Sequence, residues 1–288
     1  MQKIIGIIII FSSIIIGFIL ESGLIHMLWK PVEIGMIFGS AFGIMIITSK
    51  RSHLILLVKQ MVSIFKVHNY NKTFYNELLS LMFELIYEAK SKNIKELDKH
   101  VEKPEDSPIF LRYPRILNDD LLRNFIVDTS RTVIASKYQP HEMEAILEEE
   151  ILNLEKENKE PMDIIHKTGE SLPGLGICVA ILGIVLTMQN LDQEVTLIGK
   201  SISGALLGTF YGVFGCYCIF HPLASSLDSY VDQNIKPLYC IKSIIIAYLL
   251  GKSPHLCVNE SRKHIATEYK PSFTELENTV NQIKSKLA

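Results

Sequence analysis

Residues 171–188 read SLPGLGICVAILGIVLTM, an apolar stretch with no ionisable side chain in its interior. Three further stretches share this property: 4–20, 32–49 and 201–220. A helix needs about 20 apolar residues to cross the hydrocarbon core of a bilayer, with a usual range of about 17–25. Backbone groups in lipid must be paired internally, which favours helices over single strands. The sequence therefore predicts an all-α polytopic membrane protein with four transmembrane helices and a large helical cytoplasmic domain.

The apolar stretches divide the chain into four segments. We predict a first transmembrane hairpin at 1–49, a cytoplasmic helical loop at 50–170, a second hairpin at 171–221 and a cytoplasmic tail at 222–288. Basic residues follow the first hairpin directly: Lys50, Arg51, Lys59 and Lys66. Positive charge near span ends favours the cytoplasm. Both termini and the long loop are therefore expected in the cytoplasm, with the short connections, Glu21–Pro31 and about Gln189–Lys200, facing outward.

The first stretch has one alternative interpretation, a signal peptide. Lys3 precedes the apolar run, as in a secretory signal. The run is unbroken to Leu20, however, and Glu21, Ser22 and Gly23 follow without a small-x-small cleavage site. We predict an uncleaved span.

Composition argues against several function classes. The net charge is −2, so no basic surplus points to nucleic acid. The cysteines have no metal-site spacing and are interpreted as reduced, structural thiols: Cys178, Cys216, Cys218, Cys240 and Cys257. The sequence contains no Walker loop, His-rich metal set or nucleophile elbow. We therefore expect no enzyme activity, no metal and no cofactor.

The polar segments show helical patterns. Apolar residues recur at helical spacing over Phe74–Ile86. Asn118 and Asp119 can cap a helix that continues through Ile126, and a third helix is expected from Pro140 to about Lys156. Residues 237–251 are too short for a span and contain a lysine, so they predict an amphipathic cytoplasmic helix that packs on a neighbour.

Glycines repeat every four residues in the second and fourth spans: Gly35, Gly39 and Gly43, then Gly204, Gly208 and Gly212. Residues four apart share one face of a helix, so each span has a groove where another backbone can approach. Packing within one subunit and packing against another subunit or a partner helix both remain open. Thr209 in the fourth span can bond back to its own helix or face a water-filled path.

The empty span interiors limit what the chain does alone. A charge at the bilayer centre costs on the order of 2.5–3.5 kcal/mol by insertion scales, and proton relays normally use intramembrane Asp, Glu or His. The four stretches contain none of these in their interiors. Alone, the protein is therefore a poor proton channel, although it can form the wall of one.

Short motifs occur in a fixed order along the chain: Lys30-Pro31-Val32-Glu33; Pro104-Glu105-Asp106-Ser107 leading to Tyr113-Pro114-Arg115-Ile116-Leu117; Phe125-Ile126-Val127-Asp128; Ser171-Leu172-Pro173-Gly174-Leu175-Gly176-Ile177; Gly208-Thr209-Phe210-Tyr211-Gly212; His221-Pro222-Leu223-Ala224; and Lys270-Pro271-Ser272-Phe273-Thr274-Glu275-Leu276-Glu277. With these motifs the chain resembles the MotA family, the A subunit of the bacterial flagellar motor stator, over nearly its whole length.

The resemblance implies partners and site residues. It implies a homo-oligomeric ring of A subunits in the lipid of the inner membrane. The ring surrounds a B subunit that has one span, a membrane aspartate and a peptidoglycan-binding domain. The long loop favours protons over sodium and contacts the rotor switch protein. Lys90 and Asp98 fall on rotor-facing positions, where Arg and Glu are commoner. Pro173, Pro222 and Thr209 fall on positions linked to the ion path and to conformational coupling.

Other classes are weighed against this one. A proton-driven energiser of the ExbB/TolQ type has three spans and an outside N-terminus, which the opening hairpin contradicts. Half of a secondary transporter needs intramembrane polar binding residues or broken helices, which are lacking. A non-transporting membrane scaffold leaves the proline and threonine positions without a role.

Overall fold

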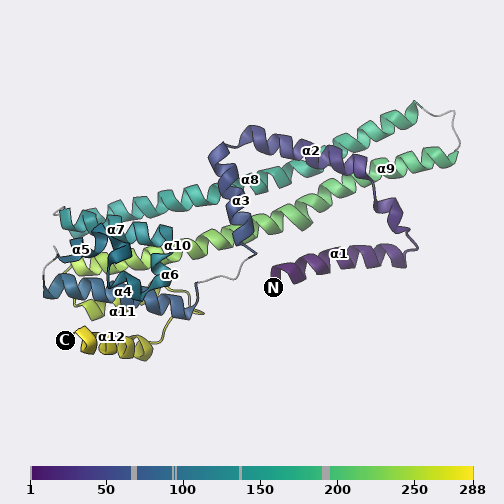
Figure 1. Cartoon of the computed structure of the whole chain (residues 1–288). Helices are drawn as coiled ribbons and strands as arrows, with labels where there is room; N and C mark the ends of the chain where they lie inside the picture. Colours follow the sequence, from purple (N-terminus) through teal and green to yellow (C-terminus); the bar gives the residue numbers. More distant parts are fainter. Residues whose placement is uncertain are drawn as a thin grey trace. The chain divides into compact units, whose positions relative to one another are not determined.

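A computed structural model describes residues 2–65, 70–92, 94, 96–135, 138–189 and 195–287. Every regular element in these ranges is a helix (Figure 1). Four helical segments are long and apolar enough to cross a membrane: Lys3–Leu20, Ile25–Thr48, Pro140–Met188 and Ser201–Leu249. Each contains one of the predicted spans, so the four-span, all-α architecture is confirmed. Residues 190–194 of the second short connection, Asp192 and Glu194 among them, lie outside the described residues.

The first compact unit comprises residues 1–66 and 158–229. It contains α1 (Gln2–Leu20), α2 (Pro31–Thr48), α3 (Arg51–Ser63), the second half of α8 (Pro140–Met188) and α9 (Val195–Phe214). Its small buried core joins Ile37 and Ala41 of α2 to Leu172, Val179 and Tyr211 of the third and fourth spans. The first span packs through Phe11, whose ring lies edge-on to that of Phe214 with centroids 5.3 Å apart.

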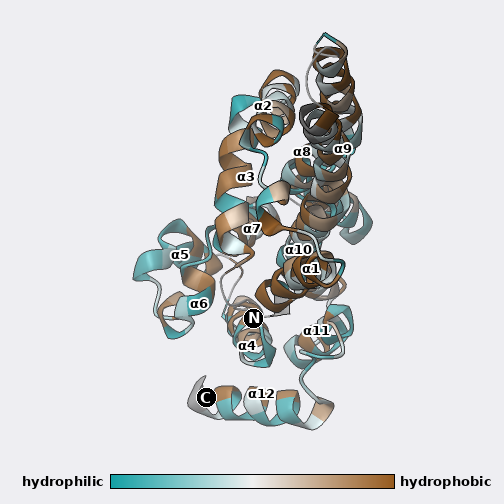
Figure 2. Cartoon of the chain, turned by 90° about the vertical axis from the view of Figure 1, so that its right-hand side faces the viewer, coloured by the Kyte–Doolittle hydropathy of each residue, from teal (hydrophilic) through white to brown (hydrophobic). Residues whose placement is uncertain are grey.

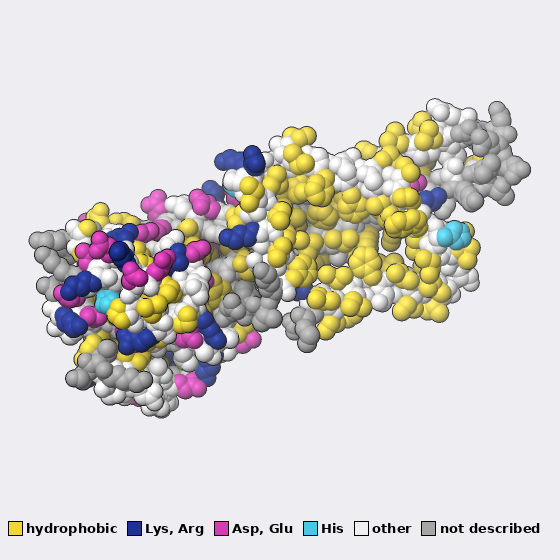
Figure 3. All heavy atoms as spheres, viewed as in Figure 1, with side chains coloured by type: hydrophobic (Ala, Val, Ile, Leu, Met, Phe, Trp, Pro, Cys, Tyr) yellow, Lys and Arg dark blue, Asp and Glu magenta, His cyan; other side chains and the backbone are white. Residues whose placement is uncertain are grey.

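Apolar side chains dominate the surface of this unit. Ile47 is 85% exposed and Leu20 79% exposed. Figure 2 shows hydrophobic residues along α1 and α9, and Figure 3 shows hydrophobic side chains gathered over the spans. An apolar patch of this extent is unfavourable in water but matches a lipid environment, where the helices satisfy their own backbone hydrogen bonds.

The second compact unit comprises residues 67–157 and 230–288. Its central helix is α4 (Lys72–Ser91), and around it lie the first part of α8 and most of α10 (His221–Leu249). Shorter helices complete the unit: α5 (Glu96–Glu102), α6 (Pro114–Leu117), α7 (Asp120–Ala135), α11 (Pro254–Ser261) and α12 (Phe273–Leu287). Single 3-10 turns are also present: Ile25–Leu28 in the first unit, and Pro104–Asp106, Phe110–Arg112 and Arg262–His264 in the second.

Several predicted elements are present in this second unit. The helix expected over Phe74–Ile86 is the middle of α4. Asp119 caps α7, because its Oδ1 accepts a hydrogen bond of 3.2 Å from the Leu122 amide. The helix expected over 237–251 packs inward, with Leu238 and Ile244 fully buried.

Two predicted helix boundaries are wrong. The helix expected to end near Lys156 continues to Met188 as α8, so it joins the third span without a break. The helix expected to begin at Pro237 is likewise the second half of α10. Pro161 and Pro237 both lie inside these helices. A proline removes one backbone hydrogen bond and kinks a helix, but packing on both sides can hold the helix together.

The five cysteines are free thiols, as the sequence predicts. Burial raises the pKa of Cys240 to about 12 and that of Cys257 to about 11. Because the thiolate is the reactive form, both groups are inert near neutral pH.

Candidate ion-path and rotor-facing sites

The third and fourth spans touch through their backbones. A Cβ atom added to Gly176 would lie 2.7 Å from the carbonyl oxygen of Gly208. One added to Gly212 would lie 3.1 Å from the Cα of Gly176 and would collide with the carbonyl of Leu172. Figure 1 shows α8 and α9 side by side along this contact. The fourth-span glycines Gly208 and Gly212 therefore serve packing within one subunit.

Pro173 and Thr209 lie at this contact. Pro173 is inside α8 and has no amide to donate to the carbonyl four residues earlier, which leaves a weak point in the helix. Thr209 lies against Gly176, since its Cα is 3.3 Å from a Cβ built there. The structure thus brings the sequence-predicted Thr209 to within about one helical turn of Pro173.

The threonines of the third and fourth spans differ in their hydrogen bonds. Thr187 donates to the carbonyl of Gly183 at 2.8 Å, the back-bonding usual for a threonine in a span. The Thr209 hydroxyl forms no hydrogen bond with any residue that the structure describes. Its hydrogen-bonding capacity remains available to water or to a partner.

Pro222 follows a π-helix, which the sequence analysis missed. Residues Gly215–Phe220 form this π-helix between α9 and α10, and the His221 amide donates to Cys216, five residues back. Proline has no amide and its ring clashes with the carbonyl four residues earlier, here that of Cys218. The wider turn accommodates Pro222 without ending the helix. Single π turns occur often at functional sites.

The second-span glycines have a different environment. Atoms built at Gly35, Gly39 and Gly43 would meet nothing within 4 Å among the described residues. Gly204 differs from Gly208 and Gly212, because it faces side chains of the second span and of the connection before it. A Cβ added to Gly204 would lie 3.1 Å from Glu33 Oε1 and 3.6 Å from Lys30 Nζ. The groove of the second span is therefore unfilled within the described chain.

Lys90 caps a helix. Its Nζ donates to the carbonyl oxygens of Gly251 at 3.0 Å and Lys252 at 2.8 Å, just past the end of α10. Gly251 has a φ of +80°, and the Lys252 amide reaches back to Ala247, so the end of α10 forms a Schellman turn. A cation at a helix C-terminus also interacts favourably with the helix dipole. Sequence reasoning placed Lys90 at a rotor-facing position but missed this internal role.

Asp98 is exposed and lies on another helix. Lys90 and Asp98 lie on different helices, because α4 ends at Ser91 and α5 begins at Glu96. α5 is fastened to α4 by buried His100, whose Nε2 lies 3.0 Å from Glu88 Oε2. The surface that presents Asp98 thus depends on a polar contact between the two helices.

His100 and Glu88 belong to a small network. His100 Nδ1 also lies 2.8 Å from the Ser107 hydroxyl, and Lys92 donates to Glu88 at 2.7 Å. Burial disfavours the ionised form of Glu88, but the hydrogen bond from Lys92 and the nearby His100 outweigh it and lower the pKa of Glu88. Ser107 is the last residue of the Pro104-Glu105-Asp106-Ser107 motif, but the sequence analysis did not assign it this contact.

Glu84 is a second buried acid that the sequence analysis missed. Its side chain is 3% exposed and forms an ion pair with Arg112. Tyr113 donates to Glu84 Oε1 at 2.7 Å, and burial together with this bond raises the pKa of Tyr113. Tyr113 is the first residue of the Tyr-Pro-Arg motif. This motif was the sequence signal that could have pointed to the contact with Glu84. Glu84 is buried and the Arg112 side chain is half-exposed, so this pair links the loop to α4 at the edge of the core.

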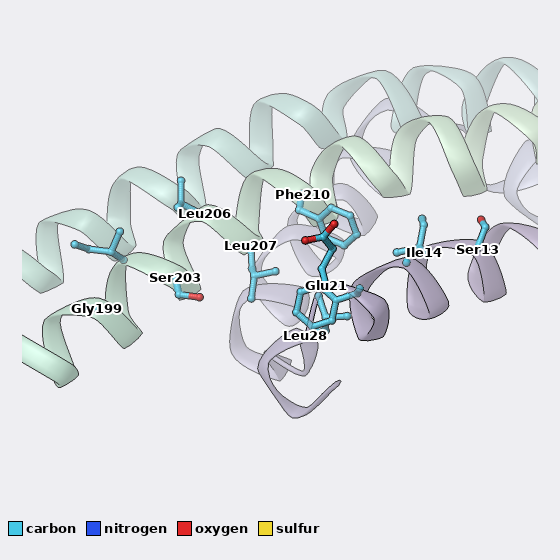
Figure 4. A pocket seen from close by; sticks show the side chains of 12 residues that line it. Ser13, Ile14, Glu21, Leu28, Gly199, Ser203, Leu206, Leu207 and Phe210 are labelled. Carbon is cyan, nitrogen blue, oxygen red and sulfur yellow. The ribbon is translucent and has the colours of Figure 1, made fainter. Parts of the chain in front are cut away.

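A groove of about 730 Å³ lies between α1 and α9 (Figure 4). Its walls are mostly apolar, and the polar side chains in it are Ser13, Glu21 and Ser203. Figure 4 shows the Glu21 carboxylate beside the Phe210 ring. The described residues contain no group of three or more His, Cys, Asp or Glu that could hold a metal.

Comparison with known proteins identifies the family. The family model described as motility protein A N-terminal matches residues 4–93, and that of the MotA/TolQ/ExbB proton channel family matches residues 117–238. Chemotaxis protein LafT of Vibrio parahaemolyticus is 36% identical over 277 residues, 96% of this chain and 97% of LafT. The chain belongs to the MotA family.

Further relatives agree with this assignment. Motility protein A of Salmonella typhimurium is 30% identical to this MotA-family chain over 285 residues, 99% of the chain and 97% of the relative. The C. jejuni MotAB structure matches with a TM-score of 0.76 at 20% identity, covering 94% of this chain and 98% of that one. The Bacillus subtilis MotAB stator complex matches with a TM-score of 0.72, also at 20% identity. These structures confirm the fold.

The resemblance inferred from the motifs is therefore confirmed. The chain is a multi-pass inner-membrane protein of a stator and proton-channel family, and that family is not a known enzyme class.

Proposed function

We propose that this chain is the A subunit of a flagellar motor stator that forms a proton-conducting complex with a B subunit and converts proton flow into torque on the rotor. The observation that carries the proposal is the α8–α9 contact. It combines a helix weakened by Pro173 and a π-helix before Pro222 with a Thr209 hydroxyl that has no hydrogen bond among the described residues. Neither span interior contains an acid.

The absence of an acid from the span interiors supports a proton path that is built from two different subunits. A wall with hydroxyls and bendable helices can surround a proton path, but it cannot bind the proton in the membrane. The carboxylate then comes from a B subunit with a single span and a peptidoglycan-binding domain. The solved relatives are described as complexes of MotA with MotB. In this proposal Pro173 and Pro222 allow the wall helices to change shape as the B-subunit acid binds and releases its proton.

The open glycine groove of the second span supports a ring of A subunits. Gly35 and Gly39 are exposed and would permit close approach of another helix. The proposed neighbour is a second copy of the chain, since a ring needs an interface on both flanks of every subunit.

The exposed acid on α5 supports a contact with the rotor switch protein. Asp98 is free to meet a positive partner at the surface, whereas Lys90 is held at the end of α10. We assign the direct rotor contact to Asp98, and to Lys90 the support of the surface around it.

Motility of a strain that lacks its own A subunit tests the proposal. Co-expression of this chain with a B subunit from the same organism should restore rotation, and Pro173→Ala should impair rotation while the complex still assembles. Full assembly with no rotation by the unaltered chain would contradict the proposed function. Unchanged torque in the Pro173→Ala variant would reduce Pro173 to a packing residue.

An energiser of the ExbB/TolQ type is the second candidate, because the matched proton-channel family includes both groups. The first hairpin argues against it. Residues 4–93 match the N-terminal model specific to motility protein A, and this range includes α1 and α2.

A further inference from the structure

Two histidine rings meet where the third span begins and the fourth span ends. His166 of α8 and His221, the first residue of α10, stack with ring centroids 4.8 Å apart and planes inclined by 6°. His166 precedes the third span by about one turn, and His221 directly follows the π-helix. Both belong to the first compact unit. Two titratable groups from separate helices thus lie together beside the proposed channel wall.

Other ionisable groups surround the pair. Glu170 Oε1 lies 3.6 Å from His166 Nδ1. On the side of the π-helix, Cys216 Sγ lies 3.7 Å from His221 Nε2, and the Tyr217 ring packs edge-on at 5.2 Å.

The nearest full ion pair between the same two helices joins Lys159 to Asp228 at 3.3 Å. Each of its members lies two helical turns from the histidine on its own helix. Glu170 is therefore the acid that faces the pair directly, and the charges of Lys159 and Asp228 offset each other.

This arrangement suits one proton. Imidazole is the side chain that can gain or lose a proton near neutral pH. Two protons on the pair would place two like charges on parallel rings 4.8 Å apart, which is unfavourable. The His166 side chain is 45% exposed, so water can reach the pair and deliver or remove a proton.

The pair also lies at a tight helix crossing. A Cβ added to Gly169 would lie 2.7 Å from the Cβ of Phe220, so α8 and the π-helix touch with no space between them. Phe220 is the last residue of the π-helix, and Pro222 is two residues further. A charge on the stacked rings acts directly on this junction.

We propose that His166 and His221 form a proton-binding site on the cytoplasmic side of the channel wall, which accepts protons that leave the path and slows proton flow when the cytoplasm is acidic. The proposal rests on the proposed function and on its membrane topology. The accepted proton binds an imidazole nitrogen and then passes to water. Water at the exposed rim can also accept protons, so the pair sets pH sensitivity and is not required for flow.

Proton uptake into right-side-out membrane vesicles tests this inference. The vesicles contain the complex of the A and B subunits, a potassium gradient with valinomycin sets the potential, and the inner pH is 7.5 or 6.0. If the pair accepts protons beside the water at the rim, a more acidic interior should remove its contribution. Uptake by the unaltered complex should therefore fall more between inner pH 7.5 and inner pH 6.0 than uptake by His166→Gln/His221→Gln under identical conditions.

Two further variants make the test specific. His141→Gln changes an exposed histidine near the start of the same helix and should keep the pH dependence of the unaltered complex. Glu170→Gln alters an exposed side chain and removes the carboxylate that lies 3.6 Å from His166 Nδ1, so it should change the size of the fall in uptake between the two inner pH values. This variant also tests the site if the double variant fails to assemble.

The possible results are distinct. The same pH dependence in the unaltered, double-variant and Glu170→Gln complexes would overturn the inference. Loss of flow at both pH values in an assembled double variant would also overturn it, because the pair would then be obligatory. No proton uptake by the unaltered complex would instead contradict the proposed function.

Discussion

At the scale of single residues, Lys90 shows how the structure changes an assignment made from sequence. By its resemblance to the family, Lys90 falls on a basic position that contacts the rotor. In the fold its ammonium group binds the carbonyl oxygens of Gly251 and Lys252. Substitutions at Lys90 therefore alter the fold as well as the surface charge. Asp98 is exposed in the first turn of α5, and a substitution there leaves the end of α10 unchanged, so it is the better residue for testing a rotor contact.

Lys90→Ala should loosen the end of α10. Two hydrogen bonds from an exposed, charged donor contribute about 1 kcal/mol after solvent screening, so amide exchange near Lys252 should accelerate about fivefold. Hydrogen exchange with mass spectrometry on the purified chain measures this directly. Lys99→Ala is the control, since Lys99 is an exposed lysine paired only with Glu96 in its own helix. Equal amide exchange in both variants would show that Lys90 does not stabilise the end of α10.

Charge reversal at Asp98 should reduce torque strongly, whereas neutralisation should have little effect. An exposed ion pair contributes about 0–1 kcal/mol, so Asp98→Asn removes little, but Asp98→Lys adds repulsion. Rotation speed of tethered cells measures the effect. Glu149→Lys, a reversal at another exposed acid, should leave speed unchanged. Normal speed in Asp98→Lys would exclude Asp98 from the rotor contact.

At the scale of elements, the sequence predicted which segments are helical but not how they join. Hydrophobic length and periodicity identify the spans and α4 because both depend on local composition. The continuity of α8 through Pro161, and the π-helix before Pro222, depend on packing against other helices. The contact of Glu84 with Tyr113 and that of His100 with Glu88 were missed for the same reason, because the partners lie far apart in the chain.

Pro222→Ala should remove the reason for the π-helix. The substitution restores an amide and removes the clash with the Cys218 carbonyl, so an ordinary α-helical turn can form from Gly215 onward. We expect normal amounts of complex in the membrane but reduced rotation. Rotation speed and co-purification with the B subunit measure the two effects separately. Unchanged rotation would show that the π-helix is not needed for coupling.

The start of α12 should respond to acid. Ser272 and Glu275 form a capping box, and Lys72 binds Glu275 at 2.8 Å. The hydrogen bond from Lys72 is the main cause that lowers the pKa of Glu275 to about 2. A lowered pKa stabilises the fold fully above the ordinary value and loses this effect as pH falls towards 2.

Hydrogen exchange measures this response. Protection of the first turn of α12, corrected for intrinsic exchange, should decline progressively between pH 4.5 and 2. Glu275→Gln should flatten this decline, and an identical decline in that variant would assign the effect to other acids.

At the scale of the whole molecule, the topology is open to a direct test. Positive charge after the first hairpin predicts that residues 50–168 and 222–288 face the cytoplasm. In a variant without the native cysteines, an impermeant thiol reagent should label a cysteine at position 192 in intact spheroplasts. It should spare one at position 141 until the cells are opened. The opposite pattern would contradict the topology and the site proposed at His166 and His221.

The uncharged span interiors have a consequence for biosynthesis. A chain without a proton carrier in its membrane interior cannot discharge the proton gradient before its partner arrives. Cells that overproduce the A subunit alone should keep their cytoplasmic pH and growth rate, as reported by a pH-sensitive fluorescent protein. Synthesis of the two subunits then needs no strict matching, because surplus copies of this one are energetically harmless to the cell.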